Sequence, residues 1–172
     1  VAIMDNVATS SGGAISISSN QSVPYFENVI ISGNTSGGNG GGIYCNDGGP
    51  IFNNVTINSN VASGLGGGFY FWATSSIPSV PYFEYSTITS NSNDGIYILS
   101  GLVTISYSNI AHNSTGFYNS NNANVLNATN NYWGHSSGPY HPSQNPTGQG
   151  DSTNAFVNVT PWLTTPNTDA PP

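Results

Sequence analysis

The sequence predicts an all-β solenoid, a rod of short parallel strands stacked coil on coil, and two observations support that prediction. A pair of apolar phrases recurs every 21 to 28 residues, and Gly, Pro and Asn clusters separate the copies. Within each phrase apolar residues alternate with polar ones, as in strands with one buried face. Because such short strands pair stably only when each repeat lies on the next, this period indicates stacked coils.

The first phrase begins with glycines and supplies one strand of each coil. Its copies are GGAISI (12–17), GGIYC (41–45), GGFYF (67–71), DGIYI (94–98) and TGFYN (115–119). Alignment of these copies places five apolar residues in one inward column: Ile15, Ile43, Phe69, Ile96 and Phe117. Cys45 falls in the next inward column with Ile17, Phe71 and Ile98, where we expect a small core residue.

The second phrase supplies another strand and a turn. Its copies are PYFENVII (24–31), PIFNNVTI (50–57), PYFEYSTI (81–88), VTISYSNI (103–110) and ANVLNATN (123–130). The expected inward columns are Phe26, Phe52, Phe83, Ile105 and Val125, then Val29 with Val55, then Ile31, Ile57, Ile88 and Ile110. Asparagines in register can pass amide hydrogen bonds between coils, and we expect such a ladder of Asn34, Asn60, Asn91 and Asn113. In the fifth copy the alignment puts Trp133 at this position instead of an asparagine. A second ladder of Asn28, Asn54 and Asn127 is interrupted by Tyr85 and Tyr107.

These phrases carry a family resemblance. GGAI (12–15) and GGGI (40–43), paired with the F-x-x-N-like FNNV from Phe52, resemble the right-handed parallel β-helix repeats of secreted surface proteins, including the polymorphic outer-membrane protein type. The segment NNYWGHSSGP (130–139) and its continuation to Leu163 are similar to the end of such proteins, where this region caps the final coil. The resemblance implies a right-handed, pectin-lyase-like parallel β-helix of about five to six coils.

One domain accounts for all 172 residues, since the chain is too short for two ordinary ones. We expect coils over 1–130, a C-terminal cap over 131–163 and a Pro/Thr-rich tail or linker over 164–172. The opening VAIMDNVATS looks like a coil already under way, in a mature or excised piece. Its uncapped edge predicts contact with another copy of the chain or an adjoining domain.

The charge of the chain excludes some classes of binding partner. The chain has no Lys or Arg and a net charge of −7, so it has no means of neutralising phosphates, and we expect neither nucleic-acid binding nor attraction to anionic membranes. No stretch approaches the apolar length of a membrane span, so membrane insertion is not expected either. The coat of short polar residues favours an extracellular or cell-surface location.

Aromatic residues form the first candidate site. Tyr44, Tyr70, Tyr97 and Tyr118 occur once per coil on the outward side of the first strand, with Trp72 close by. A row of aromatic rings on a flat sheet can bind sugar rings or another protein, so these five residues are the predicted ligand-binding set. The same pattern also arises where tyrosines merely stabilise neighbouring strands.

Acidic residues form the second candidate site. Asp5, Glu27, Asn53 and Glu84 align in one outward column, which predicts about 5 Å between Asp5 and Glu27 and about 10 Å between Glu27 and Glu84. These two distances bracket the distance between the two catalytic carboxyl groups of glycosidases, so the three acids are catalytic candidates. Solvated surface acids are nevertheless far commoner than catalytic pairs. Carboxylate and amide oxygens in one strip also suit Ca²⁺, the one cofactor that the sequence admits.

The predicted cap contains motifs that fit exposed loop residues better than a site. GHSSG (134–138) matches the nucleophile-elbow pattern around Ser136, but lacks the strand, the helix and the order of partners that this chemistry needs. His135 and His141, with Asp151 beyond, have no recognised metal spacing. Of the N-x-[ST] sequons, Asn20 and Asn158 fall in expected loops and are the predicted glycosylation sites.

Together these patterns favour a non-enzymatic extracellular surface protein, adhesive or structural, and extend to a self-assembling filament or surface-layer unit. A polysaccharide-binding or polysaccharide-cleaving β-helix domain is the alternative. The sequence favours the absence of enzymatic activity without deciding it.

Overall fold

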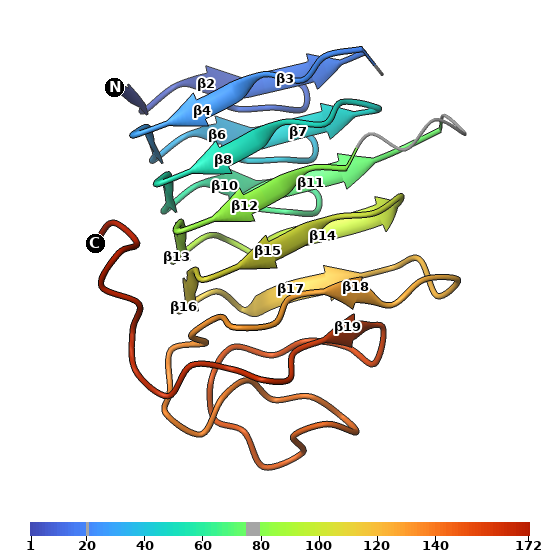
Figure 1. Ribbon diagram of the computed structural model, residues 1–172. Helices are drawn as coiled ribbons and strands as arrows, with labels where there is room; N and C mark the ends of the chain where they lie inside the picture. The colour runs from blue at the N-terminus through green and yellow to red at the C-terminus, as the bar shows by residue number, and fades with distance from the viewer. Residues whose placement is uncertain (20, 75–79) are drawn as a thin grey trace.

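The chain forms a parallel β-solenoid of about five coils (Figure 1). This computed structural model describes residues 1–19, 21–74 and 80–172, and these residues contain strands but no helix. Every strand pairs in parallel with the equivalent strand of the coil above or below, which confirms the predicted parallel β-helix. The short strands are therefore stable through stacking rather than through pairing within a coil.

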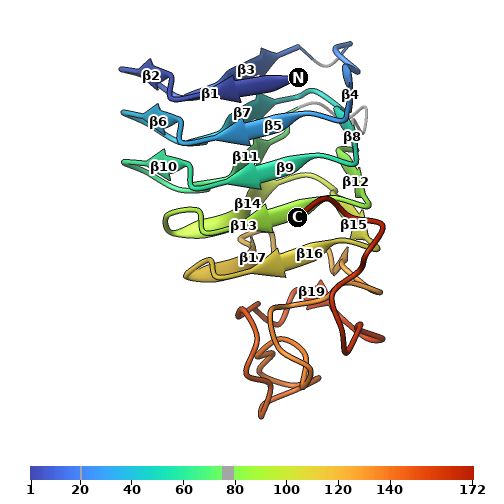
Figure 2. The same ribbon diagram turned by 90° about the vertical axis from the view of Figure 1, so that its left-hand side faces the viewer.

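Two of the four sheets lie on one side of the rod (Figure 2). Sheet A consists of β1 (Ala2–Met4), β5 (Ile30–Ser32), β9 (Thr56–Asn58), β13 (Thr87–Thr89) and β16 (Asn109–Ala111). Sheet B is smaller and consists of β2 (Val7–Ala8), β6 (Thr35–Ser36) and β10 (Val61–Ala62).

Sheet C carries the first repeated phrase, and sheet D carries the start of the second phrase, which continues into sheet A. Sheet C consists of β3 (Ile15–Ser18), β7 (Ile43–Asn46), β11 (Phe69–Trp72), β14 (Asp94–Ser100) and β17 (Thr115–Asn119). Sheet D consists of β4 (Tyr25–Glu27), β8 (Ile51–Asn53), β12 (Tyr82–Glu84), β15 (Thr104–Ser106), β18 (Leu126–Asn127) and β19 (Val157–Asn158).

The inward columns of the structure follow the sequence alignment closely. Phe69 pairs with Ile43 on one side and Ile96 on the other, and Cys45 pairs with Ile17 and Phe71 as expected. The phenyl ring of Phe52 stacks on Phe26 and Phe83, with ring centroids 5.1 and 4.3 Å apart. Like side chains therefore pack on like through the centre of the rod, which buries a continuous apolar core.

The fifth copy of the second phrase departs from the alignment. Thr104 pairs with Asn127, so Ala128 rather than Val125 stands below Ile105. Val125 is 63% exposed, whereas Leu126 is buried. The prediction for Val125 was wrong because the alignment placed this copy of the strand too early in the sequence, and Ala128 takes the position given to Val125.

A ladder of buried amides runs through the turn after sheet A. The Nδ2 groups of Asn34, Asn60 and Asn91 each donate to the Oδ1 of the next asparagine, at 2.9 to 3.1 Å. Asn6 adds an upper rung through a 2.9 Å bond to Asn34 Oδ1. At the lower end Asn113 Nδ2 donates to Asp151 Oδ2 at 2.9 Å. The predicted ladder of four asparagines is confirmed, and Asp151 extends it beyond Asn113. Trp133, which the alignment put at this position, is buried next to Gly116 of β17 instead.

A second interior ladder was not predicted. The hydroxyl of Ser86 accepts the Val55 amide N–H, the hydroxyl of Ser108 accepts the Ser86 N–H, and Asn131 Oδ1 accepts the Ser108 N–H, at 2.9 to 3.2 Å. Ser86, Ser108 and Asn131 have no exposed surface. These small polar groups satisfy backbone donors that the bend between sheets D and A leaves unpaired.

The turn after sheet D requires a left-handed backbone in every coil. Its residues with positive φ are Asn28 (56°), Asn54 (54°), Tyr85 (47°), Tyr107 (49°) and Asn130 (60°). Asn130 rather than Asn127 continues this column, a correction that follows from the shift at β18. Asn54 donates a side-chain hydrogen bond to Asn28, and the Tyr85 and Tyr107 rings stack at 5.7 Å.

The chain after β18 folds in irregular turns across the lower end of the rod (Figure 1). Trp133 is fully buried there, and β19 pairs with β18. The segment expected as a tail or linker returns along sheet A (Figure 2). There Asn167 donates to and accepts from Asn109, and Ala170 is buried. Within the described residues no helix has the length and apolarity that a membrane crossing would require.

Candidate functional site

The tyrosine column lies on the outer side of sheet C, one residue per coil as predicted. Neighbouring rings of Tyr44, Tyr70, Tyr97 and Tyr118 have centroids 5.4 to 5.7 Å apart and planes within 13° of parallel. Rings lying flat in one plane would overlap at this spacing, so the four rings stand on edge and stack face to face along the rod. The outer side of the column thus consists of ring edges and hydroxyl groups, not of ring faces.

Stacking covers the faces of the inner rings. Tyr70 is 4% exposed and Tyr97 is 9% exposed, whereas Tyr118 at the lower end is 38% exposed. Burial, with smaller contributions from Tyr44 and Tyr97, raises the pKa of Tyr70. Trp72 is exposed at the end of β11. Exposed aromatic surface on sheet C is therefore concentrated at Trp72 and Tyr118, not spread along a continuous platform.

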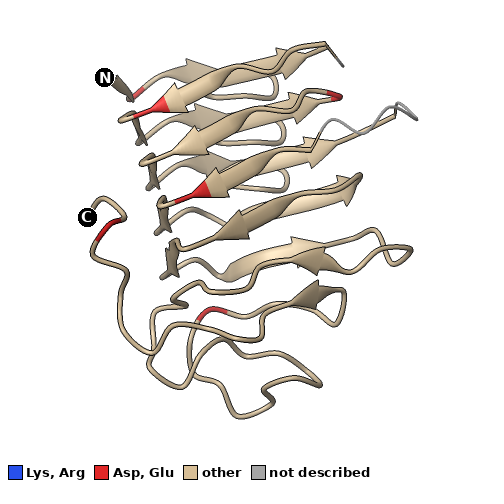
Figure 3. Ribbon diagram, viewed as in Figure 1, with Lys and Arg blue, Asp and Glu red and all other residues tan. Residues whose placement is uncertain are grey.

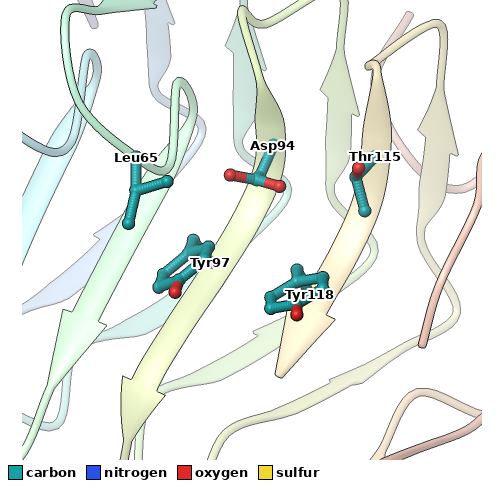
Figure 4. A pocket seen from close by; sticks show the side chains of 5 residues that line it. All are labelled: Leu65, Asp94, Tyr97, Thr115 and Tyr118. Carbon is teal, nitrogen blue, oxygen red and sulfur yellow. The ribbon is translucent and has the colours of Figure 1, made fainter. Parts of the chain in front are cut away.

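A shallow pocket of about 340 Å³ opens beside the lower tyrosines (Figure 4). Asp94 and Tyr97 of β14 and Thr115 and Tyr118 of β17 line it, and Leu65 covers one side from the turn before β11. Asp94 pairs directly with Thr115 and Tyr97 with Tyr118, so the register of two strands sets the positions of four lining residues.

Asp94 is the charged group of this pocket. It is 7% exposed, and within the described residues its carboxyl group has one hydrogen bond, a 3.4 Å contact from the Gly66 N–H to Oδ2. Burial raises the pKa of the Asp94 carboxyl, and the Gly66 bond opposes that effect only in part. Sequence reasoning missed this residue. The available signal was DGIYI (94–98), where an aspartate replaces the first glycine of the phrase.

The predicted acidic column exists only in part. Glu27 pairs with Asn53 and Asn53 with Glu84, so the two glutamates lie two coils apart on sheet D with an amide between them. Asp5 does not join them. β1 pairs with β5 and the Asp5 N–H donates to Ser32, so Asp5 stands level with Gly33 in the turn after sheet A. The close pair of Asp5 and Glu27 was therefore a wrong prediction.

The error at Asp5 has a clear physical origin. Both Asp5–Asn6 and Glu27–Asn28 end a short apolar stretch with an acid and an asparagine. The ladder bond from Asn6 to Asn34 assigns the first pair to the turn after sheet A. The sequence alone offered two alignments for this opening stretch, and the amide ladder distinguishes them.

The histidines of the C-terminal segment differ from expectation. His141 is 0% exposed: its Nε2 bonds to the Val157 carbonyl at 2.9 Å, and its Nδ1 accepts the Gln144 N–H at 2.9 Å. His141 is thus a structural residue of a buried turn, not an exposed loop histidine. His135 is half-buried and bonds to Ser137, while Ser136 of the elbow-like motif is exposed in this turn.

Clusters of metal ligands and the thiol of Cys45 are the remaining candidate groups. Among the described residues no three His, Cys, Asp or Glu side chains come together as a metal site would require. Burial raises the pKa of the Cys45 thiol to about 12, so this core residue is unreactive at neutral pH.

The two predicted glycosylation sites have different outcomes. Asn20 lies outside the described residues. Asn158 is half-exposed and lies in β19 rather than in a loop, paired with Asn127. Two other sequons, at Asn34 and Asn113, lie in the buried ladder, where a glycan would not fit.

Comparison with known protein families gives a match to one coil of the solenoid. Residues 28–46 match the Chlamydia polymorphic membrane protein repeat. This repeat spans β5, β6 and β7, from the turn at Asn28 to the end of the GGGIYC strand. The match and the parallel solenoid together agree with the resemblance to β-helix repeats of polymorphic outer-membrane proteins. Comparisons with curated proteins and with solved structures found no match.

The repeat bears on location at a coarse level. The polymorphic membrane protein family is associated with the outer membrane and the surface, and a surface location for this chain agrees with that association.

Proposed function

We propose that this chain is a non-enzymatic extracellular surface protein with a structural or adhesive role. One observation supports this proposal: side chains that point outward from the sheets pack between successive coils, as the inward side chains do. The outward tyrosines of sheet C stack on one another as the inward phenylalanines do. A rod stabilised on both sides of its sheets is suited to displaying a fixed surface.

The distribution of acids supports this role over catalysis. Figure 3 shows the acidic residues that it displays spread along the rod, without a Lys or Arg beside any of them. Glu27 and Glu84 are separated by Asn53, and Asp5 belongs to another turn. A glycosidase needs two carboxyl groups held on either side of one bond.

The first coil supports a role in assembly. β1, β2, β3 and β4 each form the edge of their sheet, and Val7 in β2 is highly exposed. Unpaired parallel edges favour pairing with another strand. We therefore propose that this coil joins an adjoining domain or another copy of the chain, as in a filament or surface layer.

Surface labelling tests the proposed location and role. Antibodies raised against the purified chain should label intact cells of the source organism as strongly as permeabilised cells. Labelling that requires permeabilisation would contradict the surface assignment. Negative-stain images at increasing concentration test assembly separately, because isolated particles throughout the range would remove the filament form.

The exposed side chains of Trp72 and Tyr118 favour one alternative, a polysaccharide-binding or polysaccharide-cleaving domain. A glycan array followed by a reducing-end assay distinguishes the two functions. Binding that is lost in Trp72→Ala, with turnover that is lost in Glu27→Gln, would replace the structural role by the alternative.

A further inference from the structure

We infer that the pocket formed by Leu65, Asp94, Tyr97, Thr115 and Tyr118 binds a lysine or arginine side chain of a partner protein. This inference rests on the proposed surface role and names the chemistry by which the rod would hold its partner. It starts from the Asp94 carboxylate, which is buried and has no cationic partner among the residues that the structure describes.

Buried carboxylates in proteins are normally paired or fully hydrogen-bonded. Asp94 is 7% exposed, and from the described part of the chain its carboxylate accepts one long hydrogen bond, from Gly66 at 3.4 Å. The chain contains no Lys or Arg, so no side chain of that kind exists within it to neutralise this group. A cationic side chain from another protein would complete the site. A second copy of this chain could not provide one, because it too has no Lys or Arg.

The other lining groups fit an ammonium or guanidinium group on a flexible stem. Tyr97, Tyr118 and Thr115 add hydroxyl oxygens to the lining of the same pocket (Figure 4), and these oxygens can accept hydrogen bonds from a cationic group. Leu65 provides an apolar wall against which the aliphatic part of a lysine or arginine can pack. The negative charge of the whole chain would also speed the approach of a basic partner.

Ring geometry favours a cation over a sugar. Tyr97 lies between Tyr70 and Tyr118, with centroids 5.7 and 5.4 Å away, so neither of its faces is free to stack on a pyranose ring. An ammonium group needs only oxygen acceptors and does not require those faces. Divalent metal ions prefer six or more oxygen ligands, and this pocket supplies a single carboxylate.

Binding of short peptides to the intact 172-residue chain tests the inference. The probes are acetyl-Gly-Lys-Gly-amide, its arginine analogue and a norleucine analogue that keeps the stem without the charge. Isothermal titration should detect the lysine and arginine peptides, and their affinity should fall as salt is raised. The norleucine peptide should bind at least about tenfold more weakly, as expected for loss of a charged contact.

A matched pair of variants separates the pocket from the general negative field. Asp94→Asn and Glu84→Gln each remove one negative charge, but Glu84 lies on sheet D. Asp94→Asn should weaken the lysine peptide by about tenfold or more, and Glu84→Gln by less than about twofold. Equal losses in the two variants, or equal affinity for the norleucine peptide, would overturn the inference.

Further variants keep the test informative if Asp94→Asn does not fold. Tyr118→Phe and Thr115→Val keep the size of each side chain and remove one hydroxyl, and each should weaken binding by about threefold. Unchanged affinity in both variants would contradict the assigned pocket. Displacement of the lysine peptide by Ca²⁺ or by neutral saccharides at similar concentrations would replace the cationic side chain by those ligands.

The outcome is independent of the location test. If the peptides do not bind but antibodies label intact cells, the proposed pocket is wrong and the surface role stands. If the peptides bind but antibodies label only permeabilised cells, the surface role is wrong and the pocket stands.

Discussion

Asn60 is the residue on which the buried ladder depends most clearly. Its Oδ1 accepts the backbone and side-chain N–H groups of Asn34, and its Nδ2 donates to Ile31 and Asn91, with all four bonds between 2.9 and 3.0 Å. Asn60→Ala would leave these buried groups without partners. We expect the free energy of unfolding to fall by about 3 to 5 kcal/mol in urea denaturation.

Asn6 provides the control for that variant because it belongs to the same ladder but is exposed. Asn6 bonds to Asn34 Oδ1 at 2.9 Å, and water can replace this bond after Asn6→Ala. We expect a loss of about 1 kcal/mol or less. Similar losses in the two variants would show that burial of the ladder is not the source of its stabilising effect.

Asp151 ends the same ladder and makes stability depend on pH. Burial raises the pKa of its carboxyl above the ordinary 3.8, and hydrogen bonds from Asn113 and His112 oppose this only in part. The folded chain therefore holds this proton more tightly than the unfolded chain. The associated stabilisation is complete below pH 3.8 and is lost as pH rises through the raised pKa.

Asp151→Asn tests this contribution because the amide cannot titrate in that range. Urea denaturation between about pH 3 and pH 8 should give an unfolding free energy that falls with pH less steeply in the variant than in the natural chain. Asp94, whose pKa burial also raises, leaves a residual slope of the same sign. An unchanged slope in Asp151→Asn would assign the pH dependence to other groups.

At the scale of the strands, the sequence predicted the positions of those residues that have a counterpart in every coil. Phe52, Phe69 and Ile57 each have counterparts of similar type one period away, so alignment places them over one another and the structure agrees. Prediction failed where a coil departs from the period. In the fifth copy Ala128 takes the inward position that the alignment gave to Val125, and the opening stretch could be aligned in two ways at Asp5.

The pocket at Asp94 was unpredictable for a related reason. It depends on one aspartate that breaks the glycine pattern, on Thr115 in the next coil and on Leu65 in the preceding turn. No single repeat contains this combination. The junction of Asn113 with Asp151 likewise spans 38 residues and an irregular segment with no period.

The tyrosine stack of sheet C gives a prediction for a whole element. Tyr97 contacts a ring on each side, so Tyr97→Ala removes two stacked pairs and opens space between β11 and β17. We expect a loss of about 3 kcal/mol in unfolding free energy, and less than about 1 kcal/mol for Tyr97→Phe, which keeps both stacks. Urea denaturation measures both variants. A comparable loss in Tyr97→Phe would point to the hydroxyl group instead of ring packing.

For the whole molecule, the lower end of the rod is as important as its coils. Trp133 is fully buried, and Asn131 and Asp151 end the two interior ladders. Removal of residues 131–172 would uncover β16 and β17 as open parallel edges above an exposed apolar core. Such edges pair with other chains, so we expect this truncated chain to form large assemblies in size-exclusion chromatography with light scattering.

Removal of residues 164–172 alone is the matched comparison. That segment contributes the bonds between Asn167 and Asn109 and between Pro171 and Thr87, but it leaves Trp133 and Asp151 in place. We expect the shorter deletion to elute as the intact chain does, with an unfolding free energy lower by about 1 to 2 kcal/mol. A soluble, cooperatively folded 1–130 fragment would mean instead that the coils close their own lower end, and the irregular segment would then be free for another role.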